Sequence, residues 1–227
     1  MVGMTAIQKT TLIDFPEHIA ATIFIQGCNF RCPYCHNKDL IKPENELLTK
    51  NYINNFVEKR RDFLQGIAFT GGEPTLYPDL GEIFKVVKRK GLAVKLDTNG
   101  SRPEVLKSLI DDNLVDYIAM DIKSDWKGYP EVIGLNFDLD KLKKSIQIIK
   151  NSNVNYEFRT TVIPTVITKD TVNNIINNII KKDVKKYVLQ RYQVVSGYIE
   201  KEHTKKEWYE LEETFEKYEF MDFRDNF

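Results

Sequence analysis

The chain has 227 residues, 42% hydrophobic and 29% charged, a composition typical of one soluble domain with a sizeable core. Its 33 lysine and arginine residues balance 33 aspartate and glutamate residues, so no global basic field favours nucleic acid as a partner. The sequence has no apolar run long enough to span a membrane and nothing that resembles a targeting segment. We therefore expect a single cytoplasmic domain over residues 1–227.

Apolar, β-branched runs alternate along the chain with amphipathic runs that repeat apolar residues at helical spacing. The first run, residues 19–26, predicts a buried strand and leads into the segment that contains all the cysteines. Further strands are expected at 66–70, 93–97, 115–121, 154–163 and 186–193, and helices at 49–61, 79–90, 103–111, 138–150, 170–181 and 205–218. About six β/α units in series favour a parallel sheet with helices outside it.

The length of the chain decides between a closed and an open barrel. A closed eight-stranded α/β barrel typically needs about 250 residues. We therefore expect an α/β fold with a partial, open (β/α)6 barrel that resembles a TIM barrel. The barrel core is expected over residues 18–193, after an N-terminal hairpin or flap at 1–17 and before a C-terminal helix and tail at 194–227.

The only cysteines, Cys28, Cys32 and Cys35, lie within eight residues. At this C-x3-C-x2-C spacing each thiolate can bind one iron of a [4Fe–4S] cubane, whereas ordinary electron-transfer clusters use four cysteines. With no fourth cysteine, one iron is expected to stay open for a ligand that is not protein. A Cys3His zinc site using His36 is the alternative, although adjacent residues seldom both reach one tetrahedral ion. An odd cysteine count argues against disulfides.

Three polar motifs follow predicted strands where those strands end. They occupy residues 71–74 (Gly-Gly-Glu-Pro), 97–100 (Asp-Thr-Asn-Gly) and 121–123 (Asp-Ile-Lys). Singly, each is typical of an ordinary turn, helix cap or surface ion pair. Because the carboxyl ends of barrel strands share one face, we expect the motifs to form one polar site beside the cysteines. Arg159, inside an apolar strand, indicates either a contact with this site or a structural ion pair.

With the Cys-His-Asn end of the cysteine run and Glu-Phe-Arg-Thr-Thr at 157–161, these motifs resemble the organic radical-activating enzymes of the radical S-adenosylmethionine (SAM) superfamily. More narrowly, the chain resembles the anaerobic ribonucleotide reductase activating proteins. The resemblance implies an oxidoreductase whose [4Fe–4S] cluster, held by Cys28, Cys32 and Cys35, cleaves SAM reductively. The 5′-deoxyadenosyl radical would take hydrogen from a glycine of a partner glycyl-radical enzyme, of the anaerobic ribonucleotide reductase or pyruvate formate-lyase type. A flavodoxin- or ferredoxin-like protein would supply the electron.

The same resemblance implies roles for residues around the cluster. Tyr34 and His36 flank the third cysteine, and Tyr34 is expected to contact the adenine of SAM. Gly72 is expected to contact the methionine part of SAM, so a side chain at this position would occupy the place of the ligand. The rest of the SAM site is expected at Asp121, Ile122, Lys123 and Arg159.

In the formate-lyase branch of the family, an Asp-Thr pair and the aspartate of the D-x-K motif hold a monovalent cation near the SAM carboxylate. The matching residues are Asp97, Thr98 and Asp121. A histidine that closes the SAM site at the last strand in that branch has no counterpart, because residues 190–193 read Gln-Arg-Tyr-Gln. This difference weakens a formate-lyase assignment. The alternative enzyme is a small-molecule radical SAM protein, such as a deazaguanine-forming synthase, and the non-enzymatic alternative is an iron–sulfur or zinc protein.

Overall fold

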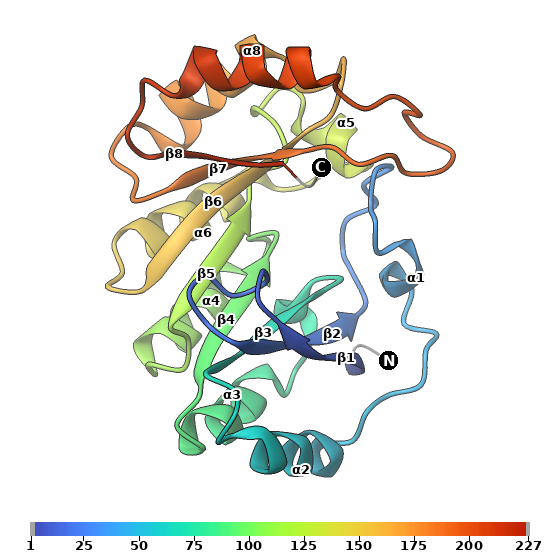
Figure 1. The fold of residues 1–227 in the computed structure, drawn as a ribbon, viewed down its shortest axis with the longest axis vertical. Helices are drawn as coiled ribbons and strands as arrows, with labels where there is room; N and C mark the ends of the chain where they lie inside the picture. Colours follow the sequence, from blue (N-terminus) through green and yellow to red (C-terminus); the bar gives the residue numbers. More distant parts are fainter. Residues whose placement is uncertain (1–2, 226–227) are drawn as a thin grey trace.

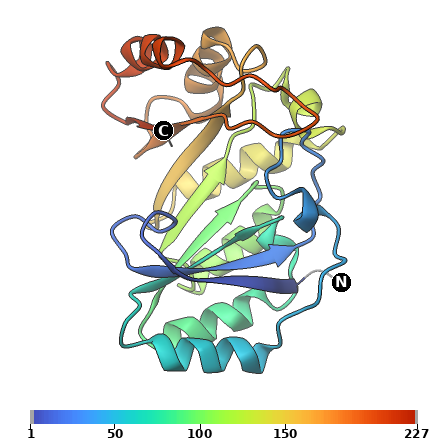
Figure 2. The same cartoon turned by 45° about the vertical axis from the view of Figure 1, so that its right-hand side comes forward.

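A computed structural model describes residues 3–225, which are built around one curved sheet of eight strands (Figures 1 and 2). The strand order follows the chain from β1 to β8, so these two strands are the edges of the sheet. β1 pairs antiparallel with β2, and all later neighbours pair in parallel. The strands are β1 (Gly3–Thr11), β2 (Ala20–Gln26), β3 (Gly66–Gly71), β4 (Ala93–Thr98), β5 (Tyr117–Asp121), β6 (Asn155–Val162), β7 (Tyr187–Arg191) and β8 (Met221–Arg224). The expected open α/β barrel is confirmed.

Helices fill the connections between the parallel strands, as βαβ crossovers require. They are α1 (Lys38–Ile41), α2 (Lys50–Arg60), η1 (Pro74–Leu76), α3 (Leu80–Arg89), α4 (Pro103–Asp111), α5 (Tyr129–Ile133), α6 (Leu139–Lys150), α7 (Lys169–Asn174), the π-helical η2 (Ile175–Ile180) and α8 (Lys205–Phe215). Every helix and strand predicted from the sequence forms within a few residues of its expected bounds. The helix expected at 170–181 is divided into α7 and η2. Over the described residues, none of the helices is long and apolar enough to cross a membrane.

The C-terminal segment adds one parallel strand to those expected from the sequence. β8 joins the sheet beside β7 after the crossover through α8. Trp208 of α8 is fully buried, and its ring meets the ring of Phe223 edge-on at 6.4 Å. A four-residue strand with alternating apolar and charged residues, Met-Asp-Phe-Arg, is too short to give a periodic signal in the sequence.

Apolar and charged side chains alternate along the central strands, so the sheet has an apolar outer face and a polar inner face. On β4, Val94 and Leu96 are buried in the apolar core, and Lys95 and Asp97 occupy the opposite face. On β6, Phe158 lies between the inward residues Glu157 and Arg159 in the same way. The helices cover the outer side of the curved sheet (Figure 1), so the inner side is available for a polar site.

The loop between β1 and β2 closes the barrel at the amino ends of its strands. Phe15 in this loop is 1% exposed, stacks on His18 at 4.1 Å and lies 6.1 Å from the ring of Tyr117. A Cβ placed on Gly66 would come within 2.7 Å of the Phe15 ring, so this position leaves room only for glycine. The plugged end directs any ligand to the carboxyl ends of the strands.

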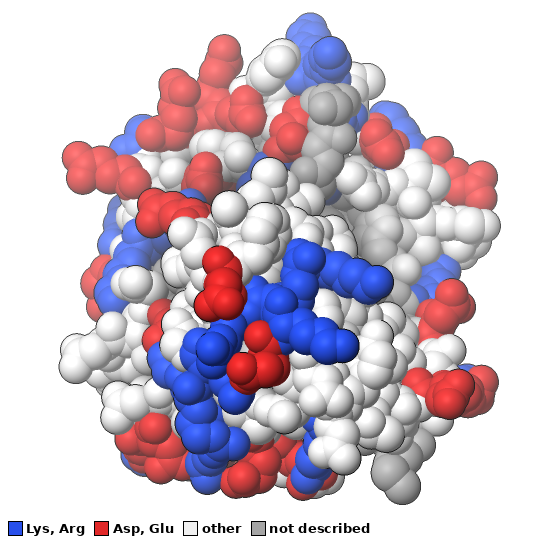
Figure 3. Space-filling model, turned by 60° about the horizontal axis from the view of Figure 1, so that its bottom comes forward, with Lys and Arg blue, Asp and Glu red and all other residues white. Residues whose placement is uncertain are grey.

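Charges on the surface are mixed. Figure 3 shows a band of lysine and arginine side chains with acidic side chains beside it on the end of the molecule that comes forward in that view. On α2 and just after it, Glu58 pairs with Arg61 at 3.1 Å and with Lys90 of the loop after α3. Exposed pairs of this kind contribute about 0 to 1 kcal/mol each, so they affect solubility more than stability.

A buried ion pair joins β8 to the centre of the sheet. Glu157 on β6 is fully buried. It accepts hydrogen bonds from both terminal nitrogens of Arg224, at 2.8 and 2.6 Å, and from the Tyr117 hydroxyl at 2.9 Å. The two parallel N–H···O bonds give this pair a defined geometry that fixes the short edge strand.

Replacing Arg224 by alanine should lower the free energy of unfolding by about 3 kcal/mol, because Glu157 would stay buried without its cationic partner. Urea denaturation followed by circular dichroism measures the change. As a control, Lys85→Ala breaks an exposed pair with Glu82 at 2.9 Å and should cost less than about 0.5 kcal/mol. Equal costs for the two variants would contradict the role of the buried pair.

Candidate functional site

The cysteines and the strand-end motifs line a single pocket of about 270 Å³ at the carboxyl ends of the strands. One wall is the loop after β2, which contributes Cys28, Phe30, Cys32, Tyr34, Cys35, His36 and Asn37. The other walls come from strand ends and contain Thr70, Gly71, Gly72, Asp97, Thr98, Asn99, Asp121, Lys123, Arg159, Thr161 and Gln190. The expected convergence of distant motifs on one face is therefore observed.

The cysteine loop has no regular structure of its own and is held by its neighbours. The amide of Cys28 donates to the Ile41 carbonyl at 3.1 Å, and the amide of Arg31 donates to the Ile133 carbonyl at 2.8 Å. The three thiols are free. Burial raises the pKa of Cys28 to about 11 and also raises that of Cys32. Metal binding must therefore displace thiol protons, since the thiolate is the ligand.

The donor set fits a cluster better than a single zinc ion. Within residues 3–225, no three Cys, His, Asp or Glu side chains lie close enough to share one metal ion. A cubane spreads its thiolates further apart than one zinc ion does, because each sulfur binds a different iron. His36 borders the pocket and is exposed to solvent. The part of its ring that is buried has lost contact with water, and this lowers the pKa of His36.

Glu73 of the Gly-Gly-Glu-Pro motif joins the turns after β3 and β4. Its side chain is fully buried. Oε1 accepts from the Thr75 amide at 3.1 Å and the Thr98 hydroxyl at 2.8 Å, and Oε2 accepts from the Asn99 amide at 2.6 Å. Burial raises the pKa of Glu73, and these hydrogen bonds partly oppose that effect. Glu73 thus positions two pocket-lining turns, a role that the sequence motif did not reveal.

Gly72 is subject to a packing constraint that the sequence did not reveal. A Cβ at this position would overlap the backbone carbonyl of Gly27, next to the first cysteine. The preceding Gly71 has φ +116° and is similarly crowded by the Ile25 backbone. The two glycines let the turn after β3 pack directly on the cysteine loop, while the backbone of Gly72 borders the pocket.

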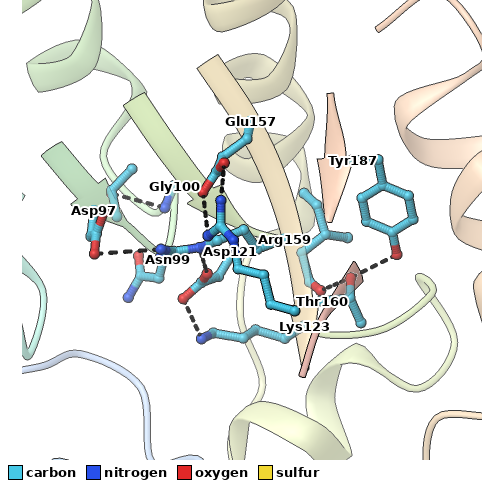
Figure 4. Close-up of polar contacts among 12 residues, drawn as sticks. Asp97, Asn99, Gly100, Asp121, Lys123, Glu157, Arg159, Thr160 and Tyr187 are labelled. Carbon is cyan, nitrogen blue, oxygen red and sulfur yellow. Dashed lines mark hydrogen bonds and ion pairs between the residues drawn. The ribbon is translucent and has the colours of Figure 1, made fainter. Parts of the chain in front are cut away.

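A network of charged side chains forms the floor of the pocket (Figure 4). Arg159 on β6 donates through Nε to Asp121 on β5 at 2.9 Å, and its Nη1 lies 3.5 Å from Asp97 on β4. Lys123 donates to the second oxygen of Asp121 at 2.8 Å. Lys95 pairs with Asp97 from two residues earlier on β4. Arg159 therefore belongs to the site and is also ion-paired, so both readings of the sequence apply.

The pKa values of this network favour the charged forms. Burial alone would raise the pKa of Asp121, but Arg159 and Lys123 outweigh it and lower that pKa to about 2. The pKa of Asp97 is lowered in the same way, by Arg159 and Lys95 acting against burial. The carboxylates in turn raise the pKa values of Arg159 and Lys123, also against burial. Asp97, Asp121, Lys123 and Arg159 are therefore charged at neutral pH.

Two further predicted residues differ in their relation to the pocket. Tyr34 borders it, and its ring, 5% exposed, lies 5.9 Å from the Lys123 ammonium. Ile122 is fully buried and is not among the pocket-lining residues. Its carbonyl accepts from the Thr160 hydroxyl at 2.6 Å, and Thr160 accepts from the Tyr187 hydroxyl at 2.8 Å (Figure 4). Ile122 therefore supports the junction of β5 and β6 without facing the pocket.

Some residues of the site were not singled out from the sequence. Asn37 donates to the carbonyl of Gly71 at 3.3 Å and links the cysteine loop to β3. Gln190 borders the pocket from β7. Lys95 does not line the pocket itself but pairs with the pocket-lining Asp97; it is 2% exposed and, like Arg159, is a charged residue within an apolar strand. Applying that criterion to β4 would have found it.

Replacing Gly72 by alanine should reduce iron loading and not only SAM binding, because the new Cβ displaces the backbone that precedes Cys28. Anaerobic reconstitution followed by iron analysis checks this. Gly81→Ala on α3, where the new Cβ meets no atom closer than 3.8 Å, should load about four irons per chain like the wild type. Full iron loading with loss of SAM binding alone would instead support a side chain in the place of the ligand.

The lowered pKa of Asp121 should stabilise the fold above its ordinary pKa of 3.8, and this contribution should fade as pH falls towards about 2. Asp121→Asn should therefore cost about 2 kcal/mol at pH 7, with the difference from the wild type shrinking below about pH 4. Urea denaturation of iron-free protein over a pH series measures it. As a control, Asp111→Asn removes the exposed partner of Lys107 and should change the free energy of unfolding little at any pH. If the difference in unfolding free energy between Asp121→Asn and the wild type grows as the pH falls, the predicted direction of the pH dependence is wrong.

Comparisons with known proteins agree with this geometry. The model of the radical SAM superfamily matches residues 22–179. A protein of Methanocaldococcus jannaschii, provisionally named a glycyl-radical enzyme activating enzyme, is 36% identical over 87% of this chain and 83% of its own length. The pyruvate formate-lyase-activating enzyme of Clostridium pasteurianum is 31% identical over 71% of this chain and 68% of its own.

A solved structure supports the fold independently of the sequence. A radical SAM methyltransferase from Sphaerobacter thermophilus superposes with a TM-score of 0.70 over 92% of this chain and 67% of its own, at 12% identity. The family match covers most of the chain, the three cysteines have the family spacing, and membership implies a [4Fe–4S] cluster and SAM. The chain belongs to the radical SAM superfamily.

Proposed function

We propose that this protein activates a glycyl-radical enzyme by removing one hydrogen atom from a glycine of that enzyme. The observation that carries the proposal is the meeting of three cysteines, the only ones in the chain, with a fixed array of charged side chains in one pocket. The similarity to a provisionally named activating enzyme over most of both chains supports this choice within the superfamily.

The residues of the pocket suit the binding of cluster and SAM. Cys28, Cys32 and Cys35 would hold three irons and leave the fourth open. Lys123 and Arg159 offer fixed positive charge to a carboxylate, and the Tyr34 ring offers an apolar surface to an adenine. When bound, the reduced cluster would supply the electron for cleavage of SAM, and SAM would supply the group that takes the hydrogen atom. The pocket walls orient SAM and exclude water.

The open barrel supports a protein substrate. β1 and β8 are separate edges of the sheet, so the strands do not form a closed ring around the pocket. An extended loop that carries the target glycine can approach the site of an open barrel more readily than it can approach the site of a closed barrel. We expect the partner to be an anaerobic ribonucleotide reductase, with enzymes of formate-lyase type second. A flavodoxin- or ferredoxin-like protein is the expected reductant.

Incubation of the reduced, iron-loaded protein and SAM with glycyl-radical enzymes of the source organism should give a glycine-centred doublet in one of them. Electron paramagnetic resonance detects the signal. Cys35→Ser, which removes one cluster ligand, should give none. If no candidate partner gains the doublet, and 5′-deoxyadenosine forms in quantity only after a purine- or pterin-like metabolite is added, the protein acts on a small molecule and the proposal is wrong.

A further inference from the structure

Two of the three residues expected around a monovalent cation already have cationic partners within the chain. Asp97 pairs with Lys95 through Oδ1 and faces Arg159 Nη1 through Oδ2 at 3.5 Å. Asp121 pairs with Arg159 Nε through Oδ1 at 2.9 Å and with Lys123 Nζ through Oδ2 at 2.8 Å. Each of the four carboxylate oxygens therefore has a positively charged neighbour.

The third expected ligand, Thr98, is also engaged elsewhere. Its hydroxyl donates to the buried Glu73 at 2.8 Å and accepts from the Gly100 amide at 3.1 Å. A hard monovalent cation needs oxygen lone pairs directed at a common point. The residues at 97, 98 and 121 do not fit a cation, because their oxygens are directed at groups of the chain.

The balance of charge gives the same result. Lys95, Lys123 and Arg159 bring three positive charges to Asp97 and Asp121. Glu157 also acts on Arg159 but is itself paired with Arg224, so these seven side chains together carry one excess positive charge before any ligand binds. The side chains of Lys95 and Arg159 are 2% and 11% exposed, which places them where water screens little. A further cation would meet uncompensated like charge in this environment.

Neighbouring strands leave space for the buried lysine. In the strand register, Lys95 lies between Ala68 on β3 and Tyr117 on β5. The small Ala68 side chain leaves room for the lysine stem on the inner face. Burying an ammonium is costly unless it is paired, and Asp97 provides the pairing two residues along the same face. Lys95 thus holds its charge in a fixed place directly below the pocket-lining Asp97.

We infer that Lys95 and Arg159 supply from the chain itself the positive charge that a monovalent cation provides in the formate-lyase branch, so that this enzyme binds and cleaves SAM without a cation. The ligand carboxylate would face Arg159 and Lys123, which line the pocket, while Lys95 lies behind the lining and would act through its pair with Asp97. This inference rests on the SAM pocket and does not depend on which molecule donates the hydrogen atom.

The first test compares SAM binding to the wild-type, iron-loaded protein in potassium chloride and in choline chloride of equal ionic strength. Choline is too large to replace potassium in a compact oxygen site. Anaerobic calorimetry should give the same dissociation constant in both salts within about twofold. Formation of 5′-deoxyadenosine, driven by a chemical reductant free of alkali cations, should also be unchanged. A severalfold loss of affinity in choline would overturn the inference.

The second test removes the charge of Lys95. Lys95→Met keeps the length of the side chain and should weaken SAM binding in choline by about tenfold, because one charged interaction near the carboxylate is lost. Potassium should recover part of this loss, since Asp97 then has a free oxygen. Lys95→Arg keeps the charge and should stay insensitive to the salt, as should the surface control Lys85→Met. Iron content and circular dichroism establish that each variant is folded.

The outcomes separate this inference from the proposed function. If Lys95→Met binds SAM in choline as tightly as the wild type does, Lys95 does not supply the charge and the inference is wrong. Both readouts, SAM affinity and 5′-deoxyadenosine formation with the chemical reductant, are measured without a partner protein. Failure to form a glycyl radical would therefore count against the proposed function alone.

Discussion

The bridge that Arg159 makes between Asp97 and Asp121 is the interaction on which the rest of the site depends. It joins three neighbouring strands, β4, β5 and β6, through buried charges that are stable only when paired. Ala119 lies between Asp97 and Glu157 in the strand register, and its small side chain leaves the space across which Arg159 reaches. The apolar core lies on the other face of the same strands, so the polar interior does not compete with it.

The cysteine loop is positioned by close packing against this rigid floor. Gly72 lets the turn after β3 lie directly on the backbone of the loop, and Glu73 ties the same turn to the end of β4. Asn99 donates to Asn29 at 3.0 Å and connects that strand end to the loop again. A loop without regular structure thereby gains a defined position beside the charged network. Such support matters because cluster ligands and SAM contacts must keep a fixed separation.

Much of the fold and the location of the site could be predicted because their signals are local. The alternation on β4 and the helical spacing of α6 depend on neighbouring residues, and strand-end motifs in an α/β barrel share one face. Local signals failed for β8, which is short and takes its stability from Glu157, 67 residues away from Arg224. They also missed the packing constraint at Gly72, because the atoms nearest to a Cβ at this position belong to a segment that is distant in sequence.

What the sequence by itself determined is the chemistry: three cysteines at family spacing, no fourth cysteine, and charged residues placed at the ends of apolar strands. Only the tertiary structure decided which of these charges pair. Asp97 and Arg159 are 62 residues apart, and their contact depends on strand register and on the small residue between them. Whether the carboxylates face a lysine, an arginine or an external cation is likewise a property of that packing. Periodicity can place a charge on a face, but only the assembled sheet selects its partner.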